Sequence, residues 1–272
     1  MKNWFQKFRK KNSANFLTVG LNLSNNASIC IMKGGEIDFY LESERITRKK
    51  RDSNVRDLLK YIKGTPDLIA ISDCHWDRGS KTLGTARDIA AIKTTFPKTK
   101  LLDYTKCHHK VHAAGAWYNS GFKEGVAIVV DSNGSKTDDG IEIETIYDLP
   151  SWNVLHKKYF ESQSVGVGKL FESVCKYYGF HEEDAGKVMG LAAIDNGQAR
   201  KVQVIWERRA LELSDYAEGK DLILTGGCFL NCKVNYILRQ ALDQQIYAQP
   251  VAHDGGTSIG AAYLAYTGHT GC

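Results

Sequence analysis

The chain has 272 residues, of which 43% are hydrophobic and 25% charged, and its formal net charge is +5. This composition excludes a mainly disordered, collagen-like or coiled-coil protein. No apolar run approaches the roughly 20 residues needed to cross a bilayer. The length allows one large domain or two lobes, each with its own core.

We expect no secretory signal at the N-terminus, because no apolar segment follows its basic residues. The seven cysteines are scattered, and an odd number without paired spacing is typical of reduced thiols. We therefore expect a cytoplasmic protein without a membrane span, located in the host cytoplasm if the chain is viral.

Basic residues are concentrated in two segments. Residues 1–16 contain five basic residues and no acid, so this tail alone accounts for the net charge, and Arg45–Arg51 contains five more. The tail also has an apolar stripe at helical spacing, formed by Trp4, Phe5 and Phe8. Two interpretations stay open: a solvated or self-docking tail, or contact with the phosphates of a nucleic acid or an acidic lipid surface.

Strand and helix patterns occur twice along the chain. Each half begins with apolar segments separated by polar or glycine turns, typical of a three-stranded meander, and continues into α/β units. In the first half we expect strands within 17–32, Glu36–Glu42 and Leu68–Ser72, and helices at 54–63 and Thr82–Thr95. In the second half we expect strands at Gly125–Asp131, Gly140–Tyr147, Ser151–Phe160, Asp221–Leu224 and Ile246–Tyr247, and helices at 168–179, Lys233–Ala241 and from Gly256 to about Tyr266.

This recurrence predicts two similar lobes with a small-molecule site in the cleft between them. The fold class expected is α/β, a two-lobed fold of the actin-like ATPase and sugar-kinase type with a central cleft. The predicted division is a basic tail at 1–16, lobe I at 17–124 and lobe II at 125–272. A single doubly wound sheet is the alternative.

The strongest chemical signal is a cluster of three histidines. His108 and His112 are spaced i and i+4, so on a helix they share a face and can bind one metal ion. His109 lies between them. A solvent-exposed histidine cluster without a ligand role fits the spacing equally well.

Two aspartates are candidates to complete such a site. Asp131 ends an apolar strand, and Asp254 precedes Gly255, Gly256 and a small-residue helix, where backbone amides and a helix N-terminus suit a metal or a phosphate. Two histidines with carboxylates favour iron, manganese or zinc over calcium. Each aspartate alone is more commonly a turn residue or an N-cap.

Two glycine motifs give weaker signals. A strand runs into Gly226 and Gly227, and glycine lets the backbone approach a nucleotide closely, although the segment is neither a Walker A loop nor a Rossmann fingerprint. Lys187 follows Gly186 and could place an amine on a phosphate or carbamoyl oxygen, whereas a surface turn is the commoner fate of such a segment.

Taken together, these motifs resemble the N-terminal domain of the carbamoyltransferase family that includes nodulation-factor and tobramycin carbamoyltransferases, a domain similar to the tRNA threonylcarbamoyl-transfer protein. The resemblance covers roughly residues 17–266, with the motifs in the family's order. The matching segments are Ser24–Ser28, Lys33–Ile37, Glu42–Arg48, His108–Ala113, Asp131, Ala185–Ala192, Gly226–Asn231 and Asp254–Ala262.

The resemblance implies a metal bound by four side chains, with Fe²⁺ as the first choice and Mn²⁺ or Zn²⁺ as alternatives. Acting as Lewis acid and template, it would help a substrate hydroxyl attack a carbamoyl carbon. The implied ligands are His108, His112, Asp131 and Asp254. The implied nucleotide contacts are Gly226, Gly227 and Asn231, with Gly255 and Gly256 beside the phosphate; Lys187 would contact the donor, and His109 is a general-base candidate by proximity.

Two departures from the family pattern affect the donor. Asn25 and Asn26 stand where the family has His-Asp, and the sequence ends at Cys272, before the family's C-terminal domain, which makes carbamoyl-adenylate from carbamoyl phosphate and ATP. We expect either that a separate protein supplies the adenylate or, preferably, that carbamoyl phosphate is used directly, with ATP as a further possible ligand.

The basic segments and several aromatic residues favour DNA as the acceptor, with 5-hydroxymethylcytosine carbamoylated by a phage-type enzyme. The candidate stacking groups are Trp4, Phe5, Phe8, Trp76 and Trp117. The alternatives are a small-molecule alcohol, such as a sugar, antibiotic or nucleotide, and a non-catalytic nucleotide-binding subunit of a tRNA-modifying assembly. A metallopeptidase is disfavoured, because His109 replaces the glutamate of HExxH.

Overall fold

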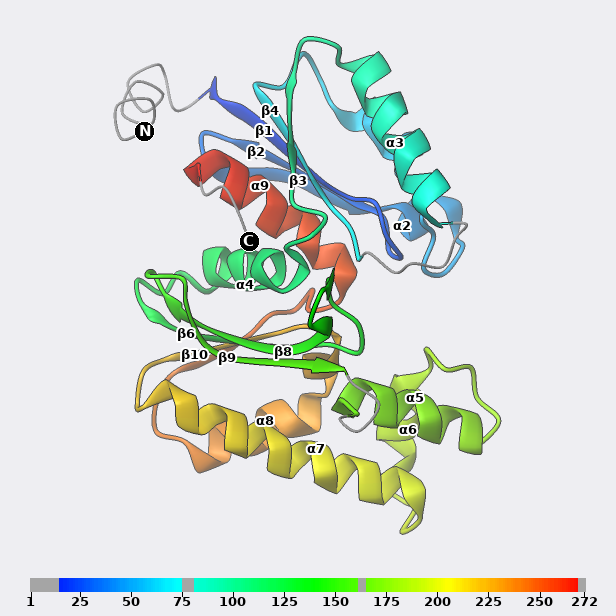
Figure 1. The fold of residues 1–272 in the computed structure, drawn as a ribbon, viewed down its shortest axis with the longest axis vertical. Coiled ribbons are helices and arrows are strands. Elements are labelled where there is room, and N and C mark those ends of the chain that lie inside the picture. The colour runs from blue at the N-terminus through cyan, green and yellow to red at the C-terminus, as the bar shows by residue number, and fades with distance from the viewer. Residues whose placement is uncertain (1–14, 75–80, 161–164, 269–272) are drawn as a thin grey trace. The chain divides into compact units, whose positions relative to one another are not determined.

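The computed structural model describes residues 15–74, 81–160 and 165–268 (Figure 1). The predictions for the tail, including Trp4, Phe5 and Phe8, and for Trp76 lie outside these residues. In the described part of the chain, no helix is long and apolar enough to span a bilayer.

The chain divides into two compact units, Met1–Tyr118 together with His253–Cys272, and Asn119–Ala252. The prediction of two lobes is therefore confirmed, and the alternative of a single doubly wound sheet is wrong. The division differs from the predicted lobes in two respects. Residues 119–124, predicted in lobe I, belong to the second unit, and the last helix belongs to the first unit because it packs on the first sheet.

The first unit is built on a five-stranded sheet in the order β3-β2-β1-β4-β5. The first three strands form the predicted antiparallel meander, and β4 and β5 run parallel to β1. The strands are β1 (Leu17–Asn22), β2 (Ser28–Lys33), β3 (Glu36–Glu42), β4 (Leu68–Ser72) and β5 (Lys100–Asp103).

Helices cover both faces of this sheet. Alternate strand residues such as Leu21 and Ile29 form a core with Ile92 of α3, whereas Cys30 and Met32 point to the opposite face and pack on α9. Figure 1 shows α3 and α9 on opposite sides of the sheet. The helical elements of this unit are α2 (Ser43–Thr47), η2 (Arg56–Tyr61), α3 (Lys81–Thr95), α4 (His108–Ser120), η5 (Asp254–Gly256) and α9 (Thr257–Thr267).

Glycine allows α9 to pack unusually closely on its neighbours. A Cβ at Gly20 would collide with the Ser258 carbonyl oxygen, and one at Gly260 would collide with the Val111 carbonyl oxygen of α4. Gly115 faces Gly260 across this contact. The contact brings the first turn of α4 alongside the turn that precedes α9, and both carry predicted site residues.

The second unit repeats the strand plan of the first. Its six-stranded sheet has the order β11-β10-β6-β8-β7, and β9 pairs with β8. The first long strand again pairs antiparallel with the second and parallel with a later strand, which confirms the predicted recurrence. The strands are β6 (Gly125–Val130), β7 (Lys136–Thr137), β8 (Gly140–Leu149), β9 (Asn153–Phe160), β10 (Leu222–Thr225) and β11 (Ile246–Ala248).

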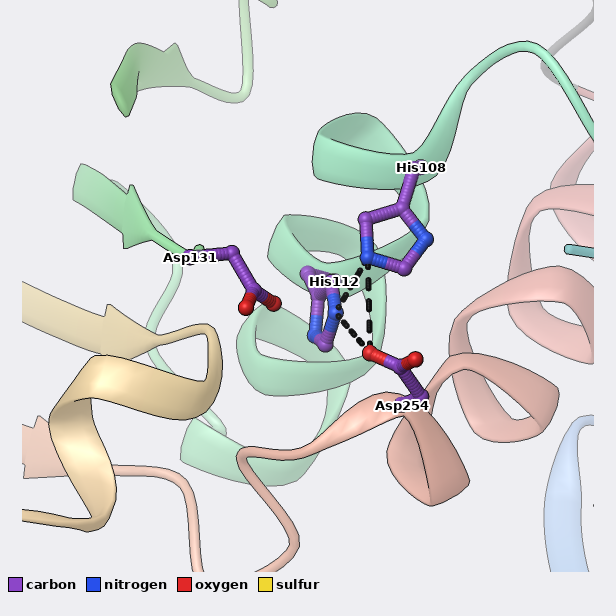
Figure 2. Close-up of side chains that lie close together, drawn as sticks. All are labelled: His108, His112, Asp131 and Asp254. Carbon is purple, nitrogen blue, oxygen red and sulfur yellow. Dashed lines mark hydrogen bonds and ion pairs between the residues drawn. The ribbon is translucent and has the colours of Figure 1, made fainter. Parts of the chain in front are cut away.

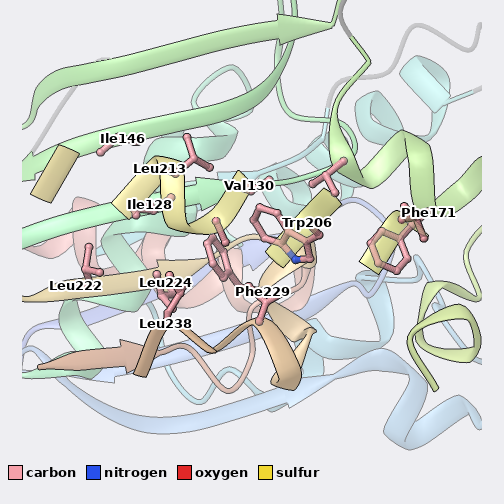
Figure 3. Packing of buried hydrophobic residues seen from close by; sticks show 14 of the residues in the cluster. Ile128, Val130, Ile146, Phe171, Trp206, Leu213, Leu222, Leu224, Phe229 and Leu238 are labelled. Carbon is pink, nitrogen blue, oxygen red and sulfur yellow. The ribbon is translucent and has the colours of Figure 1, made fainter. Parts of the chain in front are cut away.

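One large apolar core lies between this sheet and its helices (Figure 3). Trp206 and Phe229 pack with their ring centroids 5.1 Å apart at its centre, and both are almost fully buried. The helical elements are α5 (Val167–Tyr177), α6 (Ala185–Leu191), α7 (Gln198–Ser214), η3 (Asp215–Ala217), η4 (Gly227–Leu230) and α8 (Cys232–Ala241).

The cysteines agree only in part with the sequence-based expectation. Free thiols in the described residues include Cys30, Cys175 and Cys228, all with a pKa that burial raises. Cys107 is disulfide-bonded, so the prediction that all seven cysteines are reduced is wrong for this residue.

Candidate metal centre

Three of the predicted ligands meet in the first unit (Figure 2). The Nε2 atoms of His108 and His112 are 3.1 Å apart, and they lie 3.5 and 3.7 Å from Oδ1 of Asp254. Both imidazoles are almost fully buried, and the carboxylate is partly buried. The alternative of a solvent-exposed histidine cluster is therefore wrong.

The local sequence explains this convergence. His108 is the first residue of α4, and His112 follows one turn later, so the two rings project from one face with their centroids 4.6 Å apart. Asp254 begins the short turn η5, directly before α9. The close packing of α4 on α9 then places the carboxylate opposite the rings.

The spacing of the three atoms suits a divalent ion. Ligand atoms roughly 2.0–2.2 Å from a tetrahedral ion lie about 3.3–3.6 Å from each other, which is close to the separations among His108, His112 and Asp254. Although burial opposes ionisation of Asp254, hydrogen bonding and charge from the two imidazoles outweigh it and hold the pKa of the carboxyl far below its usual range. The carboxylate is therefore ionised beside the imidazoles, and a metal ion would displace the imidazole protons that carry the compensating charge.

A polar hairpin turn supports the carboxylate through Ser24 and Asn22, neither of which the sequence analysis named as a site residue. Ser24 donates from Oγ to Oδ2 of Asp254 at 3.3 Å. Its backbone N–H donates to Oδ1 of Asn22, whose side-chain amide donates to the carbonyl oxygens of Asn25 and Asn26. The signal in the sequence was the serine and asparagine content of the turn between the first two strands.

Gly255 and Gly256 use their amides within the turn itself. The N–H of Gly255 donates to Nδ1 of His253 at 3.1 Å, and the N–H of Gly256 donates to the His253 carbonyl oxygen at 2.9 Å. Neither amide is left for a phosphate in this conformation. Their phosphate contact stays a prediction that requires the turn to change.

His109 has a different environment from its two neighbours. Its side chain is 0% exposed, and its ring centroid lies 6.0 Å from that of His108. A general base must reach the proton that it removes. The role of His109 as a base stays a prediction, and this burial gives it no support.

Asp131 belongs to the second unit, where backbone amides orient its carboxylate. It follows β6, and it accepts hydrogen bonds from the N–H of Ser132 at 2.7 Å and of Gly227 at 3.3 Å. Gly226 has φ +89°, which a side chain would strain, and a Cβ there would collide with the Val130 carbonyl oxygen. The paired glycines thus hold the Asp131 carboxylate.

Two other predicted residues of the second unit make contacts within it. Asn231 caps α8 by accepting from the N–H of Val234, and it exchanges amide hydrogen bonds with Gln203 at 2.8 and 3.3 Å. Lys187 lies on the exposed side of α6, 2.8 Å from Asp184. The segment around Lys187 is helical, so its interpretation as a surface turn is wrong. Donor and nucleotide contacts for Lys187 and Asn231 stay predictions.

The sequence matches a family model described as Carbamoyltransferase N-terminus over residues 76–210 and 195–263. The chain belongs to this family. Nodulation protein NolNO of Sinorhizobium fredii is 26% identical over 217 residues, covering 58% of this chain and 30% of its own length. Nodulation protein NolO of Bradyrhizobium diazoefficiens is 26% identical over 205 residues, covering 58% and 37%. The matches thus span about a third of the length of these relatives.

Similar folds occur among solved structures. Component A of the (R)-2-hydroxyglutaryl-CoA dehydratase of Acidaminococcus fermentans matches with a TM-score of 0.55 and 15% identity, covering 93% of this chain and 99% of that one. HypF of T. kodakarensis matches with a TM-score of 0.57 and 13% identity, covering 93% and 47%. These likenesses concern the fold alone, and they confirm the α/β actin-like and sugar-kinase type of architecture. The cleft between lobes stays a prediction.

Proposed function

We propose that this chain is the transfer domain of a metal-dependent O-carbamoyltransferase. The observation that carries the proposal is the convergence of His108, His112 and Asp254 in a member of the carbamoyltransferase family. Asp131 is proposed as the fourth ligand. The donor set of imidazoles and carboxylates favours Fe²⁺, with Mn²⁺ or Zn²⁺ as alternatives.

The bound ion would supply Lewis-acid polarisation of the donor. The proposed reaction moves a carbamoyl group from carbamoyl phosphate, or from carbamoyl-adenylate, to an alcohol. The acceptor oxygen bonds to the carbamoyl carbon, the bond from that carbon to the phosphate oxygen breaks, and the phosphate or adenylate leaves with the electron pair. The hydroxyl proton passes to a base, for which His109 is the candidate by position.

The chain's own residues would bind and orient the donor. His108 and His112, fixed on one helical turn, would keep the two imidazole ligands in register, and Ser24 would hold Asp254 in orientation. Lys187 is proposed to contact the phosphate, after exchanging its present partner Asp184 for the donor. A nucleotide would lie along Gly226, Gly227, Asn231, Gly255 and Gly256, and a separate protein could supply carbamoyl-adenylate.

DNA containing 5-hydroxymethylcytosine is the proposed acceptor. The described basic segment supports binding of a polyanion, because Arg45, Arg48, Lys49 and Lys50 are all exposed. Contacts between such side chains and phosphates make binding weaken steeply with salt. In a plot of the logarithm of the DNA-binding constant against the logarithm of salt concentration, Lys49→Ala should reduce the size of the slope by about 1.

The deciding experiment compares acceptors by mass spectrometry. The protein, loaded with Fe²⁺ or Mn²⁺, is mixed with carbamoyl phosphate, with and without ATP, and with duplex DNA containing hydroxymethylcytosine. We expect the modified base to gain one carbamoyl group in place of one hydrogen. Matched DNA containing cytosine is the control and should gain nothing.

Each other result identifies a different function. Carbamoylation of a sugar or nucleotide alcohol but not of DNA would identify a small-molecule transferase. Binding of ATP or ADP with no transfer to any acceptor would identify a nucleotide-binding subunit. Full turnover in metal-free protein would refute the metal role.

Lys187→Met provides a separate test of donor contact. We expect a higher KM for carbamoyl phosphate and unchanged metal binding. Lys201→Met, which removes an exposed lysine of α7, is the matched control. An unchanged KM in Lys187→Met would remove this residue from the site.

A further inference from the structure

A buried carboxylate lies in the first unit, beside the turn that carries Asp254. Glu42 ends β3, and its side chain is only 7% exposed. Oε1 accepts a hydrogen bond from the Tyr40 hydroxyl at 2.9 Å, while Oε2 is buried with no hydrogen-bond partner among the described residues. Burial and the neighbouring Glu42 charge raise the pKa of Tyr40, so its hydroxyl keeps the proton that it donates.

His253 links this carboxylate to the metal turn. Nδ1 of His253 accepts the N–H of Gly255, so that nitrogen carries no proton, and the ring proton is on Nε2. Nε2 lies 3.6 Å from Oε1 of Glu42, too long for a direct hydrogen bond but close enough for attraction between the N–H dipole and the carboxylate. Glu42 thus favours the tautomer that caps η5.

The same groups pack directly on the backbone next to Asp254. A Cβ at Gly255 would lie 2.7 Å from Cε1 of His253 and 3.1 Å from the Tyr40 hydroxyl oxygen. The absence of a side chain at Gly255 therefore lets the imidazole and the phenol contact the turn. Any movement of His253 is transmitted to the peptide that follows Asp254.

We propose that Glu42, Tyr40 and His253 are positioning residues that fix the η5 turn, and that they thereby set the affinity and ligand geometry of the metal centre. This inference rests on the metal site of the proposed function. Groups outside the ligand set commonly act in this way, by orienting a ligand before the ion binds. None of the three residues is assigned to touch the substrate or the ion.

The test is a titration of the metal-free protein, residues 1–272, with Co²⁺, and binding is followed by the visible absorption band of the bound ion. Glu42→Gln preserves shape but removes the negative charge that orients His253. We expect affinity to fall roughly 10-fold and the absorption band to shift. The matched control is Asp38→Asn, which removes an exposed carboxylate from the same strand that pairs with Lys33. Its affinity and band should equal those of the wild type.

A double-mutant cycle tests whether Glu42 acts through His253. His253→Asn keeps a side-chain acceptor for the Gly255 N–H but removes the ring that faces Glu42. If Glu42 acts through that ring, adding Glu42→Gln to His253→Asn should weaken Co²⁺ binding no further. Additive losses would overturn the proposed route.

Tyr40→Phe keeps the proposal testable if Glu42→Gln does not fold. It removes the hydrogen bond to Oε1, and a smaller loss of affinity with the same direction of band shift is expected. A role limited to stability predicts a lower melting temperature with unchanged affinity and band, and that result would refute the inference. Failure of the wild type to bind Co²⁺, Mn²⁺ or Fe²⁺ would instead refute the proposed function.

Discussion

Each unit contains a buried cluster of histidine and carboxylate, but the two clusters differ in charge. In the first unit, Asp254 meets His108 and His112. In the second unit, Glu144 receives two hydrogen bonds from Arg209, at 2.6 and 3.2 Å, and lies 3.2 Å from Nε2 of His156. The second cluster contains a permanent cation, the guanidinium of Arg209, whereas the imidazoles of the first cluster can give up their protons to a metal ion.

The difference shows why one cluster is a ligand set and the other is structural. Burial alone would raise the pKa of Glu144, but hydrogen bonds and charge from Arg209 outweigh it and lower the pKa. The guanidinium occupies the carboxylate's lone pairs in bidentate geometry. At Asp254 the neighbours are imidazoles, which are metal ligands themselves, and three donor atoms converge. We therefore expect an ion in the first cluster and none in the second.

The largest effect should follow from removing one imidazole of the first cluster. His112→Ala leaves two of the three converging atoms, so we expect metal affinity to fall by more than about 100-fold, beyond the loss typical of outer groups. His181→Ala removes an exposed histidine of the second unit and is the control. Metal analysis after gel filtration measures both. Stoichiometric metal in His112→Ala would contradict the assignment.

Removing the cation of the second cluster should destabilise the fold without affecting metal binding. Arg209→Met strands the buried Glu144 carboxylate, and we expect a loss of about 3 kcal/mol in the free energy of unfolding. Lys220→Met removes the partner of Asp148 at an exposed site and should cost much less. Urea titration followed by circular dichroism measures both. Equal losses would show that burial of the pair is unimportant.

The glycine loop tests whether backbone geometry holds Asp131. Gly226→Ala introduces a side chain at φ +89° and against the Val130 carbonyl, so we expect a loss of about 2–3 kcal/mol. Gly219 also has a positive φ, +85°, but nothing lies within 4 Å of the position of a Cβ. Gly219→Ala should therefore lower the free energy of unfolding only through backbone strain, by about 1 kcal/mol. Thermal unfolding compares the two variants. No difference between them would mean that the close approach at Gly226 does not constrain the loop.

The smallest effect is a pH dependence of the second cluster. The native pKa of Glu144 is lowered from its ordinary value of 4.5, so its contribution to stability is fully present above about pH 4.5 and is lost as the pH falls through the lowered native value. The stability advantage of the wild type over Glu144→Gln should therefore shrink on acidification. Urea titrations from about pH 7 down to about pH 3.5 measure this difference. If the stability difference between the wild type and Glu144→Gln did not change with pH, protonation of Glu144 would not be linked to unfolding.

Local spacing patterns in the sequence predicted many of the strands and helices and part of the candidate metal site. The i, i+4 spacing of His108 and His112 placed both imidazoles on one helical face, and apolar alternation located the long strands of both sheets. Helix α7, from Gln198 to Ser214, was not predicted, because it mixes charged residues into a weak apolar pattern. Segment 54–63, predicted as a helix, forms the shorter 3₁₀ element η2.

Contacts between distant segments could not be read from spacing. Asn231 was expected at a nucleotide, but its amide pairs with Gln203 of a helix that the pattern did not reveal. Glu42 and His253 are far apart in sequence, and nothing local relates them. Such partners depend on how sheets and helices pack, which one-dimensional periodicity does not encode.

The sequence by itself determined the repeated strand plan, the family and the types of side chain available for chemistry, because these follow from hydrophobic period and motif order. The tertiary structure decided which of those side chains share a site. The glycine-mediated approach of α4 to α9 places Asp254 against two imidazoles, whereas strand β8 and helix α7 give Glu144 a guanidinium. The same residue types thus form a cation site in one unit and a neutralised pair in the other, because packing determines the charge of each carboxylate's neighbours.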